Sequence, residues 1–350
     1  MKNFLFLLAT VLSISAYSQA VFVVQNDINS SVHQTLAAAV AAAVDGDYIY
    51  MPGGSFGIGD LKVNKRLHLF GAGHYPDSTQ ATGRTALTGN IYFKTGASNS
   101  VLQGIYLSSN IYMGDSCSTG NVENILISRC NVDNISLTYN LGSTNCGAQN
   151  IFIKDCIVRT DIRGANAQGA VVETSIITNQ IAYFNGNAEF KNNIFLRYNT
   201  STNSYSYVFY NIYNCNFSNN IFRHYYSTSN YFSNSSSNNF FNNCIFGMSS
   251  NYFFAGIHSN CLFSTSFSPM FVNVPNVADF SYTYNYHLSD TSVAIGAGMN
   301  GTECGIYGGD NPYKDGAVPL NPHIQFKQIP TATDSQGKLN IEIKVSAQEN

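Results

Sequence analysis

One short pattern recurs eight times between residues 101 and 263 of this 350-residue chain. Its clearest copies are residues 127–132 and 153–158. In both, a cysteine is the fourth residue, an apolar residue stands three places before it, and another apolar residue stands two places after it. A local pattern that recurs at a loose spacing predicts stacked repeats, each burying its apolar side against its neighbours. We call the central positions the ladder column, which reads Gly104, Cys130, Cys156, Ser175, Asn193, Asn220, Cys244 and Cys261.

The ladder column advances by 17 to 27 residues from one copy to the next. Helical repeats such as the tetratricopeptide need roughly 34 residues, whereas shorter copies with alternating apolar residues favour strands. We expect each copy to be one coil with two short strands and a tight polar turn, and equivalent residues of successive coils to stack about 4.8 Å apart. The sequence therefore predicts an all-β chain that folds as a single-stranded parallel β-helix, with ladder side chains hydrogen-bonded inside it.

The first 18 residues predict a signal peptide. Lys2 precedes an apolar run over residues 4–14, which is too short to span a membrane, and residues 16–18 fit a small-residue cleavage site. No later segment is apolar enough to cross a bilayer. We therefore expect a secreted, periplasmic or extracellular protein without a membrane span.

Residues 19–60 are predicted to form an N-terminal cap. Residues 31–34 match the capping box that begins many helices, and residues 36–44 then present one apolar helical face. A strand is expected over residues 47–51. A helix laid across the first coil would cover an otherwise unpaired strand edge.

Two segments follow this helix, residues 45–54 (DGDYIYMPGG) and residues 67–73 (LHLFGAG). With the helix they resemble the start of the pectin-lyase-like right-handed parallel β-helix proteins, a family of secreted bacterial proteins, and the ladder coils continue the resemblance to residue 300. It implies right-handed coils, which the rule for parallel crossovers also favours. It implies no single activity, because this fold hosts lyases, hydrolases, adhesins and binding proteins. The paired-Asp and Gly-His-Gly motifs of polygalacturonases and the dense acidic calcium sites of pectate lyases are absent.

The coils are expected to occupy residues 61–300, and residues 301–350 to form a closing segment with a strand tail. Residues 301–313 are predicted to close the last coil. Apolar residues alternate with polar ones from Leu339 to Val345, which predicts a half-buried strand docked along the coils.

The chain has eight cysteines, an even number that suggests disulfides in an exported protein. Four of them stand in the ladder column, where we expect free thiols packed as small apolar groups. Cys117 and Cys146 form the favoured disulfide. Their spacings match no zinc site, and we expect no bound metal.

Charged residues make up 11% of the chain and the net charge is −3, which gives no argument for a nucleic-acid or anionic-membrane partner. Several charges in the earlier coils fall at equivalent places of successive copies. We interpret them as ion pairs between coils, each worth about 0.2–1 kcal/mol. They are Arg129 with Asp155, Asp133 with Arg159, and the series Lys154, Glu173 and Lys191.

Catalysis on a polysaccharide needs titratable groups gathered in one cleft. Between Asn199 and Ala278 the only charged residue is Arg223, so such a site must lie elsewhere. The catalytic candidates are Arg159, Asp161 and Arg163, at the end of a coil where loops commonly carry functional groups. A lyase there would use a basic side chain and carboxylates, with Ca²⁺ as its one conceivable cofactor.

Tyrosines are concentrated in the Ser- and Asn-rich loops of residues 198–235. Exposed tyrosine rings stack on sugars and amide side chains bind hydroxyl groups, although such rings also pack on one another. The sequence favours a glycan-binding or surface-interaction protein without a complete catalytic set, with a polysaccharide or cell-surface glycan as partner. The alternatives are a polysaccharide lyase or glycoside hydrolase, and an adhesive protein without a small ligand. The candidate binding residues are Tyr205, Tyr207, Tyr210, Tyr225, Tyr226 and Tyr231.

Overall fold

The computed structural model describes most of the chain from residue 21 onward. The predicted signal peptide, Cys117 and Cys146 lie outside the described residues. The described ranges are 21–114, 122–138, 147–165, 167–197, 207–223, 232–233, 236–253, 256–275, 279–318 and 322–346. Within them the regular structure is mainly β-strand, and no helix is long and apolar enough to cross a membrane.

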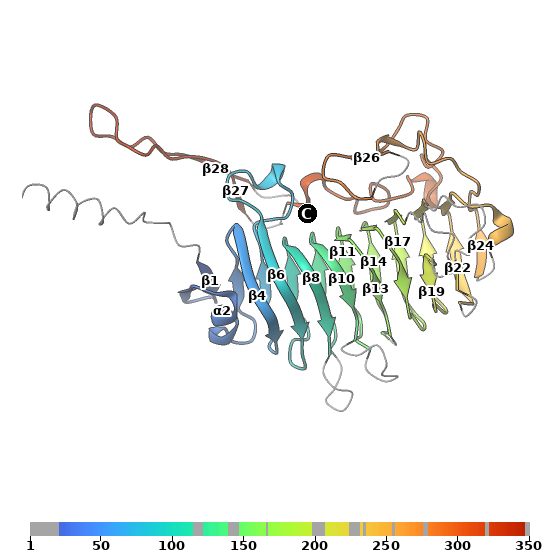
Figure 1. The fold of residues 1–350 in the computed structure, drawn as a ribbon, viewed down its shortest axis with the longest axis horizontal. Helices are drawn as coiled ribbons and strands as arrows, with labels where there is room; N and C mark the ends of the chain where they lie inside the picture. The colour runs from blue at the N-terminus through green and yellow to red at the C-terminus, as the bar shows by residue number, and fades with distance from the viewer. Residues whose placement is uncertain are drawn as a thin grey trace, which may run out of the picture.

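Two long sheets run along the molecule (Figure 1). The first, sheet A, has twelve strands, of which the first two pair antiparallel and the other ten are parallel. Their order is β2 (Ser30–His33), β1 (Phe22–Gln25), β3 (Tyr48–Tyr50), β5 (His68–Phe70), β7 (Val101–Gln103), β9 (Leu126–Ser128), β11 (Phe152–Lys154), β14 (Val171–Glu173), β17 (Glu189–Lys191), β20 (Asn216–Ser218), β22 (Asn239–Asn242) and β24 (Gly256–Ser259).

The second sheet, sheet B, also has twelve strands, and the chain passes between the two sheets once in every coil. This arrangement is compatible with the predicted parallel β-helix. Sheet B begins with the long strands β4 (Gly54–Val63), β6 (Thr85–Phe93), β8 (Tyr106–Met113) and β10 (Asn131–Ser136). Beyond β10 it divides into one row of β12 (Ile157–Val158), β15 (Ile176–Ile177), β18 (Ile194–Phe195), β21 (Ile221–Phe222) and β23 (Ile245–Phe246), and another of β13 (Ile162–Arg163), β16 (Ile181–Ala182) and β19 (Phe209–Tyr210).

Strand register confirms the repeat from its second copy onward. Ile127 pairs with Ile153 in sheet A, and Val132 pairs with Val158 in sheet B, as the pattern requires. Later copies place phenylalanines in the same register, and the rings of Phe217 and its neighbours stack face to face with centroids 4.4–4.7 Å apart. The coils are therefore built on the predicted pattern.

The first copy is displaced by one residue from its predicted position. Gln103 pairs with Ser128, so Gly104 is equivalent to Arg129. Ile105, and not Gly104, therefore stands in the ladder column. Gly104 has a φ of 73°, close to the 51° of Arg129. The prediction was wrong because Gly104, which occupies the left-handed turn position, was aligned with Cys130, the small residue one place after that position in the second copy.

Ladder side chains point inward and bond successive coils, as expected. Asn220 Oδ1 accepts from the Asn193 backbone N–H at 2.8 Å, and Asn193 Oδ1 accepts from the Ser175 N–H at 3.0 Å. Ser175 Oγ accepts in turn from the Cys156 N–H at 3.0 Å. The four ladder cysteines are free thiols, as predicted, and so are Cys215 and Cys304.

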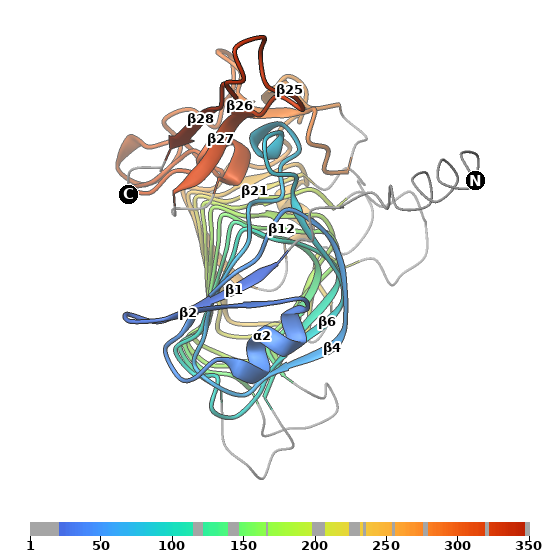
Figure 2. The same cartoon turned by 90° about the vertical axis from the view of Figure 1, so that its left-hand side faces the viewer.

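Residues 279–318, which we call the strap, fold back along the outside of sheet B rather than closing the last coil (Figures 1 and 2). The strap is bonded to coils far apart along the molecule. Asn243 Nδ2, in a late coil, donates to Ala297 O, and Arg129 Nη1, in an early coil, donates to Val318 O. The strap begins after β25 (Phe271–Asn273) and includes β26 (Asn285–Leu288), its antiparallel partner. It covers a second apolar column one place after the ladder column, in which each residue is at most 1% exposed: Ile157, Ile176, Ile194, Ile221 and Ile245.

One α-helix, α2 (Leu36–Ala42), lies beside β1 and β4 at the N-terminal end (Figure 2). Leu36, Val40 and Ala43 are buried, as the apolar pattern predicts. Val44 was placed on the same face but is 60% exposed, because the helix ends at Ala42. The predicted capping box is wrong, because residues 31–33 belong to β2 and pair with β1. Thr35 is the N-cap, and its Oγ1 accepts from the Ala38 N–H at 3.1 Å.

The C-terminal tail forms a hairpin of β27 (His323–Gln328) and β28 (Glu342–Ser346) that extends away from the coils (Figure 1). The predicted strand is thus present near its expected place. Its docking along the coils is wrong, because β28 pairs with β27 and leaves Ile343 and Val345 more than half exposed.

Candidate functional site

A polar groove lies between the outer side of sheet A and the strap. Its larger cavity has a volume of about 360 Å³ and is lined by Glu173, Lys191 and Ser218 from the sheet and by Asp310 and Asn311 from the strap. This volume is within the range of small-molecule sites, and the lining is mainly polar.

A second cavity of about 270 Å³ adjoins the first toward the earlier coils. Leu126, Arg129 and Asp155 line it from the coils, and Asp310 and Asn311 of the strap border both cavities. The groove thus runs from β9 to β20. Because neighbouring strands lie about 4.8 Å apart, these five coils span about 19 Å.

The floor of the groove is formed by residues in the left-handed backbone conformation. Arg129, Asp155, Thr174, Asn192 and Asn219 each precede the ladder column and have φ angles between 47° and 56°. Asparagine tolerates this conformation, whereas a β-branched residue such as threonine rarely adopts it. Residues other than asparagine or glycine held here cost on the order of 1–3 kcal/mol each, and such costs are concentrated at functional sites.

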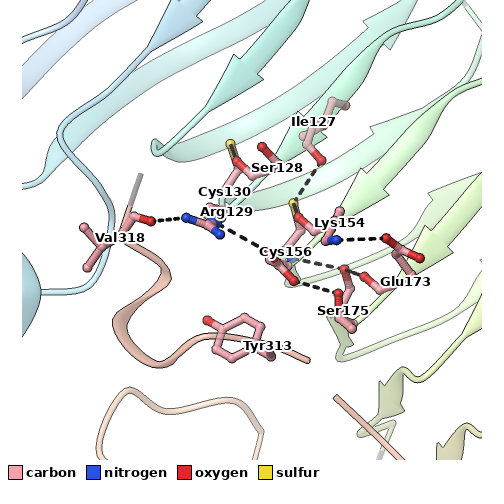
Figure 3. A network of polar contacts seen from close by, with 12 residues as sticks. Ile127, Ser128, Arg129, Cys130, Lys154, Cys156, Glu173, Ser175, Tyr313 and Val318 are labelled. Atoms are coloured by element: carbon pink, nitrogen blue, oxygen red, sulfur yellow. Dashed lines mark hydrogen bonds and ion pairs between the residues drawn. The ribbon is translucent and has the colours of Figure 1, made fainter. Parts of the chain in front are cut away.

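The three unusual floor residues are joined in one buried network (Figure 3). Arg129 Nε lies 3.4 Å from Asp155 Oδ2, and Thr174 Oγ1 donates to Asp155 Oδ1 at 2.6 Å. Arg129 and Asp155 are 6% and 3% exposed. The network places one carboxyl group between a guanidinium and a hydroxyl, beside the second cavity.

Burial raises the pKa of Asp155 above its ordinary value, against the hydrogen bond from Thr174 and the positive charge of Arg129. A partly desolvated carboxyl with a specific charged partner in a cleft is typical of functional sites. Asp155 therefore holds its proton more tightly than an ordinary carboxyl group does.

Asp155 makes stability depend on pH in the acid range. Because folding raises its pKa above 3.8, the folded protein holds this proton more tightly than the unfolded chain does. That contribution to the free energy of unfolding is present below pH 3.8 and is lost as the pH rises through the raised pKa. We expect Asp155→Asn, which stays neutral, to gain stability relative to the native protein across this window. Denaturant unfolding of both at several pH values measures the difference, and a pH-independent difference would contradict the raised pKa.

Ion pairs between coils border the groove, largely as the sequence predicts. Lys154 Nζ lies 3.2 Å from Glu173 Oε1, which confirms that pair, and the Arg129–Asp155 pair is confirmed as well. Lys191 was expected to continue the series with Glu173 but pairs with Glu189 of its own strand. Glu189 stands two residues away on the same face of β17, so it reaches Lys191 without crossing between coils.

Floor asparagines hold the strap that forms the far wall. Asn192 Nδ2 donates to Gly305 O at 3.2 Å, and Asn219 Oδ1 accepts from the Met299 N–H at 2.9 Å. The sequence analysis missed this role. The sequence feature that could have indicated this role is the asparagine that directly precedes the ladder residue in successive later coils, beginning with Asn192.

The predicted catalytic residues lie away from this groove, and two of them, Asp161 and Arg163, are brought together in an ion pair. Asp161, 5% exposed, accepts from Arg163 Nη2 at 2.8 Å and from Asn179 Nδ2 at 2.6 Å. Arg159 donates to Asn131 and packs over the ring of Tyr106, 4.6 Å from its centroid, and it pairs with Asp133 at 3.8 Å as predicted. None of the three lines either cavity of the groove.

Two of the six predicted binding tyrosines are described. The rings of Tyr207 and Tyr210 stack with centroids 5.8 Å apart, and Tyr210 meets Tyr183 edge to face at 5.3 Å. These rings pack on one another and line neither cavity of the groove. The other four, Tyr205, Tyr225, Tyr226 and Tyr231, lie outside the described residues.

No protein-family model, curated protein or solved structure matches this chain. Among the described residues, no three histidine, cysteine or acidic side chains are grouped as ligands for a metal ion.

Proposed function

We propose that this protein binds an extracellular glycan as an extended chain in the groove between sheet A and the strap. The observation that carries the proposal is the groove itself, in which two adjoining cavities share Asp310 and Asn311 and cross five coils. A length of about 19 Å suits several linked sugar units better than one.

The polar groups of the groove favour a glycan with little net charge. Lys154 pairs with Glu173 and Lys191 with Glu189. Arg129 pairs with Asp155, and the strap adds one charge of each sign, Asp310 and Lys314, so positive and negative groups are equal in number. Amide and hydroxyl groups, such as those of Asn311 and Ser218, bind sugar hydroxyls as donors and acceptors. A strongly anionic polymer would need an excess of cationic groups, as at phosphate sites.

The same proposal includes the fold family of the protein and its export from the cell. We infer a right-handed, pectin-lyase-like β-helix in which α2 covers the N-terminal coil, exported by the segment of residues 1–18. The tyrosines of residues 198–235 remain a competing binding surface for the same class of ligand.

A glycan array probed with the purified protein tests this function. We expect binding to a neutral oligosaccharide, and about 3–10-fold weaker binding by Asn311→Ala, because one hydrogen bond contributes about 0.5–1.5 kcal/mol. Asn242→Ala is the matched control, an exposed amide on sheet A that lines neither cavity. Titration calorimetry on the best ligand measures both variants.

Two results would count against the groove. Equal binding by Asn311→Ala and the native protein would place the ligand elsewhere. Binding lost in Tyr207→Ala but kept in Asn311→Ala would assign it to the tyrosine surface.

A second candidate function is a polysaccharide lyase or glycoside hydrolase, and one observation favours it. Asp155 is buried beside the second cavity with a raised pKa, as expected of a group that donates a proton. New unsaturated uronate product or new reducing ends, lost in Asp155→Asn while binding persists, would establish the enzyme. Ca²⁺ belongs to this candidate only, as an addition to the assay.

A further inference from the structure

The last coil exposes two positions whose partners in the coil before are buried. Leu262 is 41% exposed and pairs with Ile245, which is 1% exposed, and the inward-facing His258 is exposed where its partner Phe241 is fully buried. On the outer face, Ile257 is 63% exposed beside the exposed Phe240. Phe263 stacks on Phe246 at 5.0 Å but is itself only partly buried. The C-terminal end of the row therefore presents an apolar rung with no coil over it among the described residues.

The backbone at this end is unpaired as well. Sheet A ends at β24, which among the described strands pairs only with β22. Ser259 O accepts from the Asn243 N–H, so Ser259 directs its backbone groups toward β22. Because this direction alternates along a parallel strand, His258 directs its N–H and C=O to the open edge.

This edge lacks the charged residues that normally protect one. Native proteins place charged residues, lysine above all, or proline on exposed edge strands to prevent pairing with another chain. Here no Asp, Glu, Lys or Arg occurs between Arg223 and Asp279. The strand itself therefore brings no like-charge repulsion between two copies and no charge to attract a partner of opposite sign.

We propose that the open C-terminal coil is a dimer interface, in which β24 pairs antiparallel with β24 of a second copy across a two-fold axis. A two-fold interface needs a self-complementary patch, and β24 supplies one. With the axis beside His258, the two His258 residues exchange both backbone hydrogen bonds. Ile257 then stands opposite Ser259 of the second copy, and the exposed apolar rungs cover each other.

This register predicts which charges break the dimer and which restore it. In Ile257→Lys/Ser259→Lys every new lysine faces a lysine of the second copy, twice per dimer. Like charges directly opposite are destabilising, and we expect the dissociation constant of the dimer to rise by about tenfold or more. In Ile257→Lys/Ser259→Glu the same positions pair a lysine with a glutamate, and the dimer is expected to return.

Sedimentation equilibrium of the purified native protein and variants tests the proposal. We expect twice the chain mass for the native protein and for the control Phe240→Lys/Asn242→Lys, whose exposed positions lie one coil earlier. Circular dichroism checks that each variant is folded. A monomeric native protein, or a dimer unchanged in Ile257→Lys/Ser259→Lys, would overturn the interface. A monomer in Ile257→Lys/Ser259→Glu would overturn the register.

Discussion

Asn220→Ala is expected to lower the free energy of unfolding by about 1–3 kcal/mol, because a buried polar group left without a partner costs about 1–3 kcal/mol. Asn220 is fully buried in the ladder column. Its Oδ1 accepts from the Asn193 N–H at 2.8 Å, and its Nδ2 donates to Phe190 O at 2.8 Å. Alanine leaves the Asn193 N–H unpaired inside the coils and removes the side-chain donor from Phe190 O. Urea denaturation followed by circular dichroism measures the change.

Two further variants separate the ladder bonds from loss of an amide in general. Asn216→Ala removes an exposed amide from the same coil and should change stability by less than about 0.5 kcal/mol. Asn220→Ser keeps an acceptor of the kind that Ser175 provides, so a smaller loss is expected than for alanine. If Asn220→Ala and Asn216→Ala were equally stable, the ladder bonds would contribute nothing to the fold.

Ile221 follows Asn220 along the chain. The substitution Ile221→Asp is expected to release the strap and leave the coils folded. Ile221 is 0% exposed and faces outward, against the strap. A Cβ added to Gly305 would lie 2.9 Å from Ile221 Cδ1, so the two elements are in close contact. Aspartate loses about 1.5–3 kcal/mol of apolar burial and adds the larger cost of burying a charge.

Hydrogen exchange resolves this effect by region. Amides of residues 294–318 should exchange faster in Ile221→Asp, while β20 and β22 keep their protection. Phe152→Asp is the matched control, because Phe152 is 45% exposed on the outside of sheet A and does not pack against the strap. Uniformly faster exchange in both sheets would mean that the strap and the coils unfold together.

Periodicity made the coils predictable, because each copy buries its apolar residues on the copies beside it. The alternation from Ile127 to Val132 predicts strands without knowledge of any distant segment. The ladder asparagines likewise predict hydrogen bonds between neighbouring coils. The predicted ion pairs Arg129–Asp155 and Lys154–Glu173 follow from the same register, since residues at equivalent places stack. The displaced first copy shows the limit, since a glycine fits either the left-handed position or the ladder.

The groove was not predictable in this way, because its two walls are far apart in the sequence. The sequence analysis treated Arg129, Asp155 and Lys154 as ion pairs on a surface, which their geometry confirms. Only the strap turns part of that surface into a cavity, by placing Asp310 and Asn311 across from residues some 150 positions earlier. The catalytic candidate Asp161 stood out as a loop residue, but Arg163 and Asn179 occupy its oxygens.

The sequence by itself determined the repeating coil, its inward ladder and its free thiols, because these depend on contacts between equivalent residues of neighbouring copies. Tertiary structure alone decided the site. The apolar column of Ile157 to Ile245 requires a cover, and any apolar segment of sufficient length satisfies that requirement. Which segment covers it, and what groove remains beside it, depends on how the strap fits the left-handed asparagines, a match of shape and hydrogen bonds that no local pattern encodes.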